Sequence, residues 1–202
     1  DQDRYRIYQE YIDTNSPVNM VYPLLFGNPE WTGEYYVNMP ETDEAIEAFG
    51  RWSGWVASLP STAAVEVWNE PNASGFNPGN ASWETYSKLC KTAAKYVKSV
   101  NPDLKVGIGS LVSIPYVPMD VMQQLKDYGA LDVADAISIH PYIWTNSPLG
   151  DRLDLKLSRL REWLDDNGYP DMEIWITEMG WGAGPAQMFT YEEQASYITQ
   201  AY

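Results

Sequence analysis

The chain has 202 residues, enough for one domain with a large core, and 45% of its residues are hydrophobic. Its net charge of −15 disfavours a nucleic-acid-binding protein, because such a protein would carry a basic patch. The single cysteine excludes an internal disulfide and a cysteine-based metal site, and no apolar run is long enough to predict a membrane span.

The predicted elements alternate between helix and strand along the chain. Capping residues and apolar residues at helical spacing predict helices at 5–12, 42–59, 82–100, 119–128, 151–166 and 191–202. Short apolar runs predict strands at 18–26, 64–70, 105–111, 134–140 and 173–177. Strands that are apolar on both faces and alternate strictly with helices predict a parallel sheet.

The spacing of these strands favours a barrel. Successive strands start about 38 residues apart, so eight units would need about 300 residues, and an eight-stranded barrel typically takes about 250. We therefore predict an α/β fold, a (β/α)8 TIM barrel present as a partial barrel of about five βα units. Residues 1–202 would form a single catalytic domain, incomplete at both ends. A complete five-stranded doubly wound sheet is the alternative.

Two of the predicted strands end on a glutamate. The run 64–72 reads as a buried strand that stops at Glu70, because Pro71 lacks a backbone donor and disfavours helical geometry in the preceding residue. The run 173–181 reaches Glu178 in the same way. A charge at the tip of a buried strand is costly unless it is solvated, paired or used. Glycoside hydrolysis requires two such carboxylates, so Glu70 and Glu178 are candidates for a catalytic pair. The alternative interpretation is that both are solvated carboxylates at loop edges.

Three segments together resemble motifs of clan A glycoside hydrolases. Segment 67–72, Val-Trp-Asn-Glu-Pro-Asn, looks like the acid/base motif after strand 4 of that clan. Segment 139–142, Ile-His-Pro-Tyr, is similar to its strand 6 motif, and segment 176–181, Ile-Thr-Glu-Met-Gly-Trp, resembles its nucleophile motif after strand 7. The likeness is closest to glycoside hydrolase family 39, with family 5 next. As in the clan, two predicted strands separate Glu70 from Glu178, which numbers the visible strands 3 to 7 and leaves strands 1, 2 and 8 to be supplied.

The resemblance implies a retaining glycosidase, without cofactor or metal, that cleaves β-glycosidic bonds of a poly- or oligosaccharide. Glu178 would be the nucleophile that forms a glycosyl-enzyme ester, and Glu70 the acid/base, which must be neutral at the start. Asn69 would hydrogen-bond the sugar 2-hydroxyl, and Tyr142 would donate to Glu178. The alternatives are an Asx turn for Asn69 and plain packing for Tyr142.

His140 is the only histidine, which nearly excludes a histidine-based metal site. Its place at a strand tip suits a contact to the carboxylates, and a structural role is the alternative. Glu66 shares side-chain parity with Glu70, so a bulge or a buried partner must accommodate a second acid inside the barrel. Three tryptophans follow strand tips, where barrel active sites lie, and each is either a sugar platform or a packing residue: Trp31, Trp144 and Trp181.

Two other functions remain open. One is a carbohydrate-binding barrel that has lost catalysis, against which the two glutamates argue. The other is a metal-dependent barrel enzyme, which usually adds Asp, His or Lys at several strand tips, whereas here only His140 is available. We expect a carbohydrate as the partner, rather than nucleic acid or a membrane, and a parent protein that is secreted or periplasmic. The oligomeric state is left open.

Overall fold

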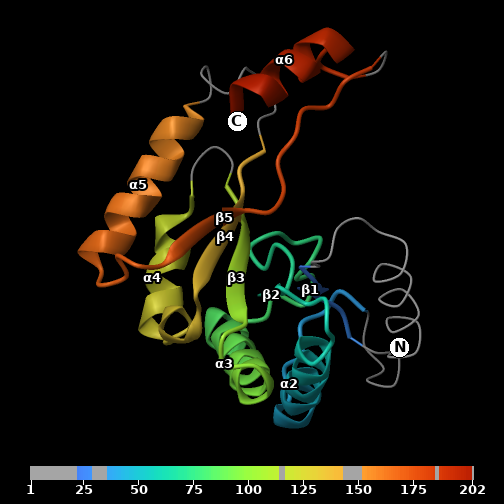
Figure 1. Cartoon of the computed structure of the whole chain (residues 1–202), viewed down its shortest axis with the longest axis vertical. Helices are drawn as coiled ribbons and strands as arrows, with labels where there is room; N and C mark the ends of the chain where they lie inside the picture. Colours follow the sequence, from blue (N-terminus) through green and yellow to red (C-terminus); the bar gives the residue numbers. More distant parts are fainter. Residues whose placement is uncertain (1–21, 29–35, 114–116, 143–151, 185–186, 202) are drawn as a thin grey trace.

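The structure is a computed structural model that describes residues 22–28, 36–113, 117–142, 152–184 and 187–201 (Figure 1). Within these residues one parallel sheet has its strands in sequential order, β1-β2-β3-β4-β5. The strands are β1 (Leu24–Leu25), β2 (Ala64–Val67), β3 (Lys105–Val112), β4 (Ala136–His140) and β5 (Glu173–Ile176). Each overlaps a predicted strand, although β1 keeps only two residues of the predicted range 18–26, part of which lies outside the described residues.

The helices also follow the predicted order. They are α2 (Asp43–Ala57), α3 (Trp83–Val100), α4 (Met119–Asp127), α5 (Leu153–Asp166) and α6 (Tyr191–Ala201), with a short 3-10 helix η2 (Leu131–Val133) before β4. The 3-10 helix was not predicted, and the predicted helix at 5–12 lies outside the described residues. Among the helices that the structure describes, none combines the length and the apolar character that crossing a membrane requires.

The strand order decides between the two predicted architectures. A doubly wound sheet reverses its strand order at a switch point, which would place helices on both faces. Here the order is sequential, and right-handed crossovers between successive parallel strands bring the helices to one face. In Figure 1, helices α2 to α5 follow one another along the sheet in this way. The fold is therefore an α/β barrel segment, and the doubly wound alternative was wrong.

Local sequence explains where the first two of these helices begin. The side chain of Thr42 accepts a backbone N–H in the first turn of α2, and that of Ser82 does the same for α3, as N-cap residues do. The two helices pack closely where Gly50 of α2 faces Tyr96 of α3. A Cβ on Gly50 would lie 2.6 Å from the Tyr96 ring, so only glycine allows this approach.

The core lies between the sheet and the helices that cover it. Every residue of β2 and β4 is buried, and β3 is buried except at its two ends. The apolar stripe of α3 packs into the same cluster, with Cys90 fully buried as the predicted inert thiol. Burial raises the pKa of the Cys90 thiol to about 12, which keeps it protonated and unreactive at neutral pH.

The inner face of the sheet carries a cavity of about 400 Å³. Leu24 on one edge strand and Ile176 on the other are 38% and 40% exposed. In a closed barrel, layers of side chains from alternate strands fill this interior space. The described sheet thus has the geometry of a barrel segment whose interior face is partly uncovered. The cavity is lined by Tyr22, Val65, Glu66, Ile174, Trp175, Ile176 and Thr177.

A close contact inside the barrel predicts a loss of stability on substitution. Gly107 of β3 lies beneath the ring of Trp175, and a Cβ there would be 2.5 Å from the ring atom Cζ3. We expect Gly107→Ala to lower the free energy of unfolding by about 1–3 kcal/mol, the usual cost of overpacking, as measured by denaturant unfolding of the full-length protein. Gly75→Ala is the matched control, because a Cβ on Gly75 meets no atom within 4 Å. Equal stability of the two variants would show that the Trp175 ring is not held against β3.

Candidate active site

The chain kinks sharply where β2 ends. Trp68 and Glu70 have φ angles of 66° and 42°, in the left-handed region that non-glycine residues rarely adopt. The Trp68 backbone N–H still donates to the carbonyl of Leu25 in β1, at 2.9 Å. Beyond the kink, the Asn72 side chain bonds both backbone groups of Val112, at 2.9 and 3.0 Å. The loop that carries Glu70 is therefore attached to the sheet on both sides.

Two glutamates and the histidine meet at the carboxyl ends of β2, β4 and β5. One nitrogen or oxygen atom from each of Glu70, His140 and Glu178 lies within 4.8 Å of the other two. His140 Nδ1 is 2.9 Å from Glu70 Oε1 and 3.7 Å from Glu178 Oε2. The side chain of His140 is 1% exposed, that of Glu70 13% and that of Glu178 41%. The structure thus places Glu70 in the enclosed part of the site and Glu178 in the open part.

Tyr142 contacts the more exposed carboxylate. Its hydroxyl donates to Glu178 Oε2 at 2.8 Å, as the resemblance implied. Burial, together with this hydrogen bond, raises the pKa of Tyr142 to about 12. The hydroxyl therefore keeps its proton at neutral pH and orients the Glu178 carboxylate.

Asn69 carries a buried polar atom that has no partner in the described part of the chain. Asn69 is 7% exposed, and its Oδ1 is buried without a hydrogen-bond partner among the described residues. A buried acceptor without a partner costs the free energy of its desolvation, so such atoms are rare outside functional sites. The Asx turn proposed as the alternative needs this oxygen as its acceptor and is not formed.

Glu66 is accommodated by buried partners and by a bulge on the neighbouring strand. It is 8% exposed, and its Oε1 accepts from Ser110 Oγ at 2.8 Å and from Thr177 Oγ1 at 3.0 Å. The register of β3 shifts where Gly109 and Ser110 have φ angles of 106° and 44°. This irregularity is a β-bulge, and it lies beside the Ser110 hydroxyl that contacts Glu66.

Of the three tryptophans predicted as sugar platforms, the structure describes Trp181 alone. Trp181 is 3% exposed and packs against Leu153 and Phe189, so its ring has no open face for a sugar. The prediction that Trp181 binds substrate is therefore replaced by its alternative, a role in packing. Trp31 and Trp144 lie outside the described residues, and their roles stay predictions.

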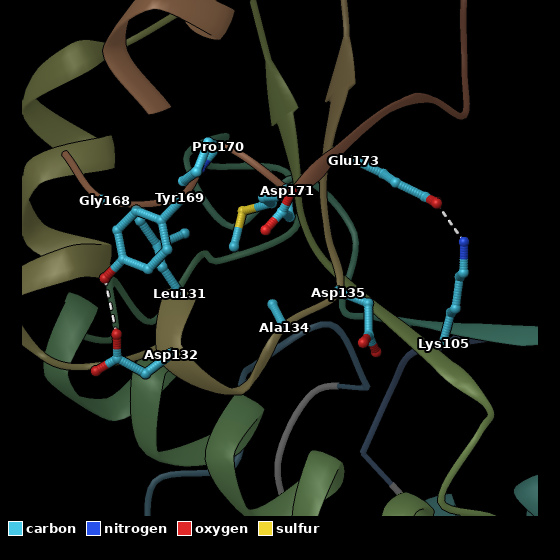
Figure 2. A pocket seen from close by; sticks show the side chains of 11 residues that line it. Lys105, Leu131, Asp132, Ala134, Asp135, Gly168, Tyr169, Pro170, Asp171 and Glu173 are labelled. Carbon is cyan, nitrogen blue, oxygen red and sulfur yellow. Dashed lines mark hydrogen bonds and ion pairs between the residues drawn. The ribbon is translucent and has the colours of Figure 1, made fainter. Parts of the chain in front are cut away.

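A second cavity, of about 480 Å³, lies at the opposite end of the strands (Figure 2). Several of its charged and polar side chains are paired within the protein: Lys105 pairs with Glu173, and Tyr169 donates to Asp132 at 2.8 Å. In barrels this amino-terminal face serves stability rather than catalysis. The cavity is lined by Lys105, Leu131, Asp132, Ala134, Asp135, Gly168, Tyr169, Pro170, Asp171, Met172 and Glu173.

A known protein family matches the part of the chain that carries these site residues. The family model described as glycosyl hydrolases family 39 matches residues 60–179, which include both glutamates and the histidine. The chain belongs to glycosyl hydrolase family 39. This membership agrees with the resemblance drawn from the sequence, and it identifies the domain as part of a glycosidase fold.

Solved structures of glycoside hydrolases share the fold. A family 39 glycoside hydrolase from the gut symbiont Bacteroides cellulosilyticus WH2 is 24% identical with a TM-score of 0.67, over 81% of this chain and 35% of that protein. A glucosidase from Croceicoccus marinus is 17% identical with a TM-score of 0.65, over 77% and 35%. This family 39 chain therefore spans about a third of the length of these two proteins. No curated protein sequence matches it.

Two hydroxyl groups near the carboxylates, those of Thr177 and Ser110, were not predicted from the sequence. Alternation along a strand places Thr177 on the same face as Trp175, toward the barrel interior, so parity alone was enough to place its hydroxyl on the face that carries Glu66. Ser110 had no such signal, because the bulge at Gly109 changes the alternation of β3.

Proposed function

We propose that the protein containing this chain is a retaining glycoside hydrolase that cleaves β-glycosidic bonds of a poly- or oligosaccharide. The spacing of the two carboxylates carries this proposal, because one oxygen of Glu70 lies within 4.8 Å of one oxygen of Glu178. Retaining enzymes hold their carboxyl groups about 5–5.5 Å apart, whereas inverting enzymes leave about 6.5–9.5 Å for a water molecule. The observed spacing supports the retaining class.

The unequal surroundings of the two glutamates support their separate roles. Glu178, the more exposed of the two and oriented by Tyr142, attacks the anomeric carbon and forms the glycosyl-enzyme ester. Glu70, enclosed beside His140, gives its proton to the leaving oxygen. Glu70 then takes a proton from the water that hydrolyses the ester, which returns both carboxyl groups to their starting state.

The unpaired oxygen of Asn69 supports a contact to the sugar. A buried acceptor beside the catalytic carboxyl group suits the 2-hydroxyl of the glycone, because that hydroxyl can donate to Oδ1. Hydrogen bonds to the 2-hydroxyl strengthen in the transition state of glycoside hydrolysis. In this role Asn69 stabilises the transition state more than the bound substrate.

The test is the anomeric configuration of the first product formed by the full-length protein. An aryl β-glycoside, followed by NMR, should first give the β-anomer of the free sugar, and activity should survive incubation with EDTA. First formation of the α-anomer would contradict the retaining mechanism. Loss of activity with EDTA would favour the metal-dependent alternative, in which Glu70, His140 and Glu178 are ligands. We further propose that the full-length protein is secreted or periplasmic, where polymeric glycans are accessible.

A further inference from the structure

Beneath the pair of catalytic glutamates, a chain of hydrogen bonds connects a third, buried glutamate to Glu70. Thr177 Oγ1 donates to Glu66 Oε1 at 3.0 Å. The same Thr177 oxygen is 3.1 Å from His140 Nε2, and His140 Nδ1 is 2.9 Å from Glu70 Oε1. Glu66 is 8% exposed and His140 1%, so the two ends of this chain are buried, while Thr177 between them borders the cavity on the inner face of the sheet.

The direction of each hydrogen bond follows from the donors available. A carboxylate can only accept, so the single hydroxyl proton of Thr177 is used for Glu66. The Thr177 oxygen is then an acceptor toward His140, and His140 Nε2 must carry a proton to complete that bond. With Nε2 protonated, the neutral imidazole has its lone pair on Nδ1, which faces Glu70.

We propose that Glu66 and Thr177 are positioning residues that fix the tautomer of His140 and so keep a proton between His140 Nδ1 and Glu70. The hydrogen bond between Glu70 and the acceptor Nδ1 exists only if the Glu70 carboxyl group carries a proton. That proton is the one that Glu70 must give to the leaving oxygen. The inference rests on the proposed role of Glu70 as the acid/base.

The bulge of β3 supports the role of Glu66 as a fixed acceptor. Ser110 Oγ donates to the same Glu66 oxygen at 2.8 Å, and the Ser110 backbone N–H is held by Ser138 Oγ at 2.7 Å. Two hydroxyl donors therefore converge on one carboxylate oxygen in the barrel interior. An acid in this place is costly to bury, and its use as an acceptor for Thr177 gives it a function beyond packing.

The proton balance of the reaction is consistent with this arrangement. When Glu70 protonates the leaving oxygen, His140 keeps its Nε2 proton and stays neutral. The ionised Glu70 later recovers its proton from the attacking water. The charged or titratable groups facing His140 are Glu70, Glu178 at 3.7 Å and the Tyr142 ring, with Glu66 beyond Thr177.

Kinetics on two substrates separate positioning from a structural role. In the full-length protein, Thr177→Val removes the hydroxyl at nearly constant volume, and Thr177→Ser keeps it. We expect Thr177→Val to lower kcat/KM on an unactivated β-glycoside by about 100-fold, within the range of general acid catalysis. The loss on a dinitrophenyl β-glycoside should be far smaller, because that leaving group needs little protonation. Thr177→Ser should keep most of the activity on both, and an equal loss on both substrates by Thr177→Val would overturn the proposal.

The tautomer can also be measured without any activity. Isotope-labelled histidine in the full-length protein, with the His140 signal assigned by its absence in His140→Asn, should show a proton on Nε2. In Glu66→Gln the amide can donate to Thr177, whose hydroxyl is then free to donate to Nε2, so the population with a proton on Nδ1 alone should rise. An unprotonated Nε2 in the unchanged protein would overturn the inference. If the protein shows the Nε2 proton but has no glycosidase activity, the proposed function fails and the tautomer assignment stands.

Discussion

Replacement of Glu178 by glycine should lower hydrolysis of an unactivated β-glycoside by several orders of magnitude in the full-length protein. The substitution removes the carboxylate that forms the ester, while Glu70 and its contact with His140 remain. Loss of a covalent nucleophile is among the largest effects of a single side chain, because no other group takes over the bond-forming step. The rate with a dinitrophenyl glycoside should fall as well, since an activated leaving group still needs an attacking group.

Added azide or formate should restore part of this lost activity. Glu178 is 41% exposed at the open side of the site, so a small anion has room to enter where the carboxylate was. The anion then attacks the face that Glu178 used, displaces the leaving group and stays bonded to the anomeric carbon, so this single inversion gives a product of inverted configuration. Glu162→Gln, an exposed change on α5, should need no rescue and serves as the control. A rescued product of retained configuration would show that Glu178 is not the nucleophile.

The order of the elements was predictable because each boundary has a local cause. Thr42 and Ser82 cap their helices, and Pro71 follows the end of β2, so propensity and capping chemistry were enough. What could not be predicted depends on contacts between distant residues. The approach of α2 to α3 at Gly50 and the bulge at Ser110 arise only when their partners are in place.

The candidate site was predictable to a similar extent. Glu70, His140 and Glu178 lie at the carboxyl ends of strands in one parallel sheet, and these ends meet at the same edge. Their clustering could therefore be predicted from the sequence, and the structure shows it. Trp181 has the same kind of position after a strand tip, but it is buried because Leu153 and Phe189 fold against it. The exposure of a loop residue depends on which distant residues pack against it, and the local sequence pattern does not predict that packing.

Replacement of Glu70 by alanine should produce a loss that depends on the leaving group. Hydrolysis of an unactivated β-glycoside should fall by about 10²- to 10⁴-fold, the usual contribution of a general acid. The first step on a dinitrophenyl glycoside should be largely preserved, because Glu178 and its bond from Tyr142 are intact. The glycosyl-enzyme ester should then accumulate, since no base is left to activate water, and mass spectrometry of the intact protein would detect the added sugar.

The configuration of the product formed with azide should differ between the Glu70 variant and the Glu178 variant. In Glu70→Ala the ester still forms on Glu178, and azide attacks it from the face that Glu70 occupied, beside His140. Two inversions give a glycosyl azide of retained configuration, whereas the Glu178 variant gives the inverted product. The difference depends only on which carboxylate carries the sugar, and it is insensitive to modest losses of stability in either variant. A retained product from Glu178→Gly together with an inverted product from Glu70→Ala would reverse the two assignments.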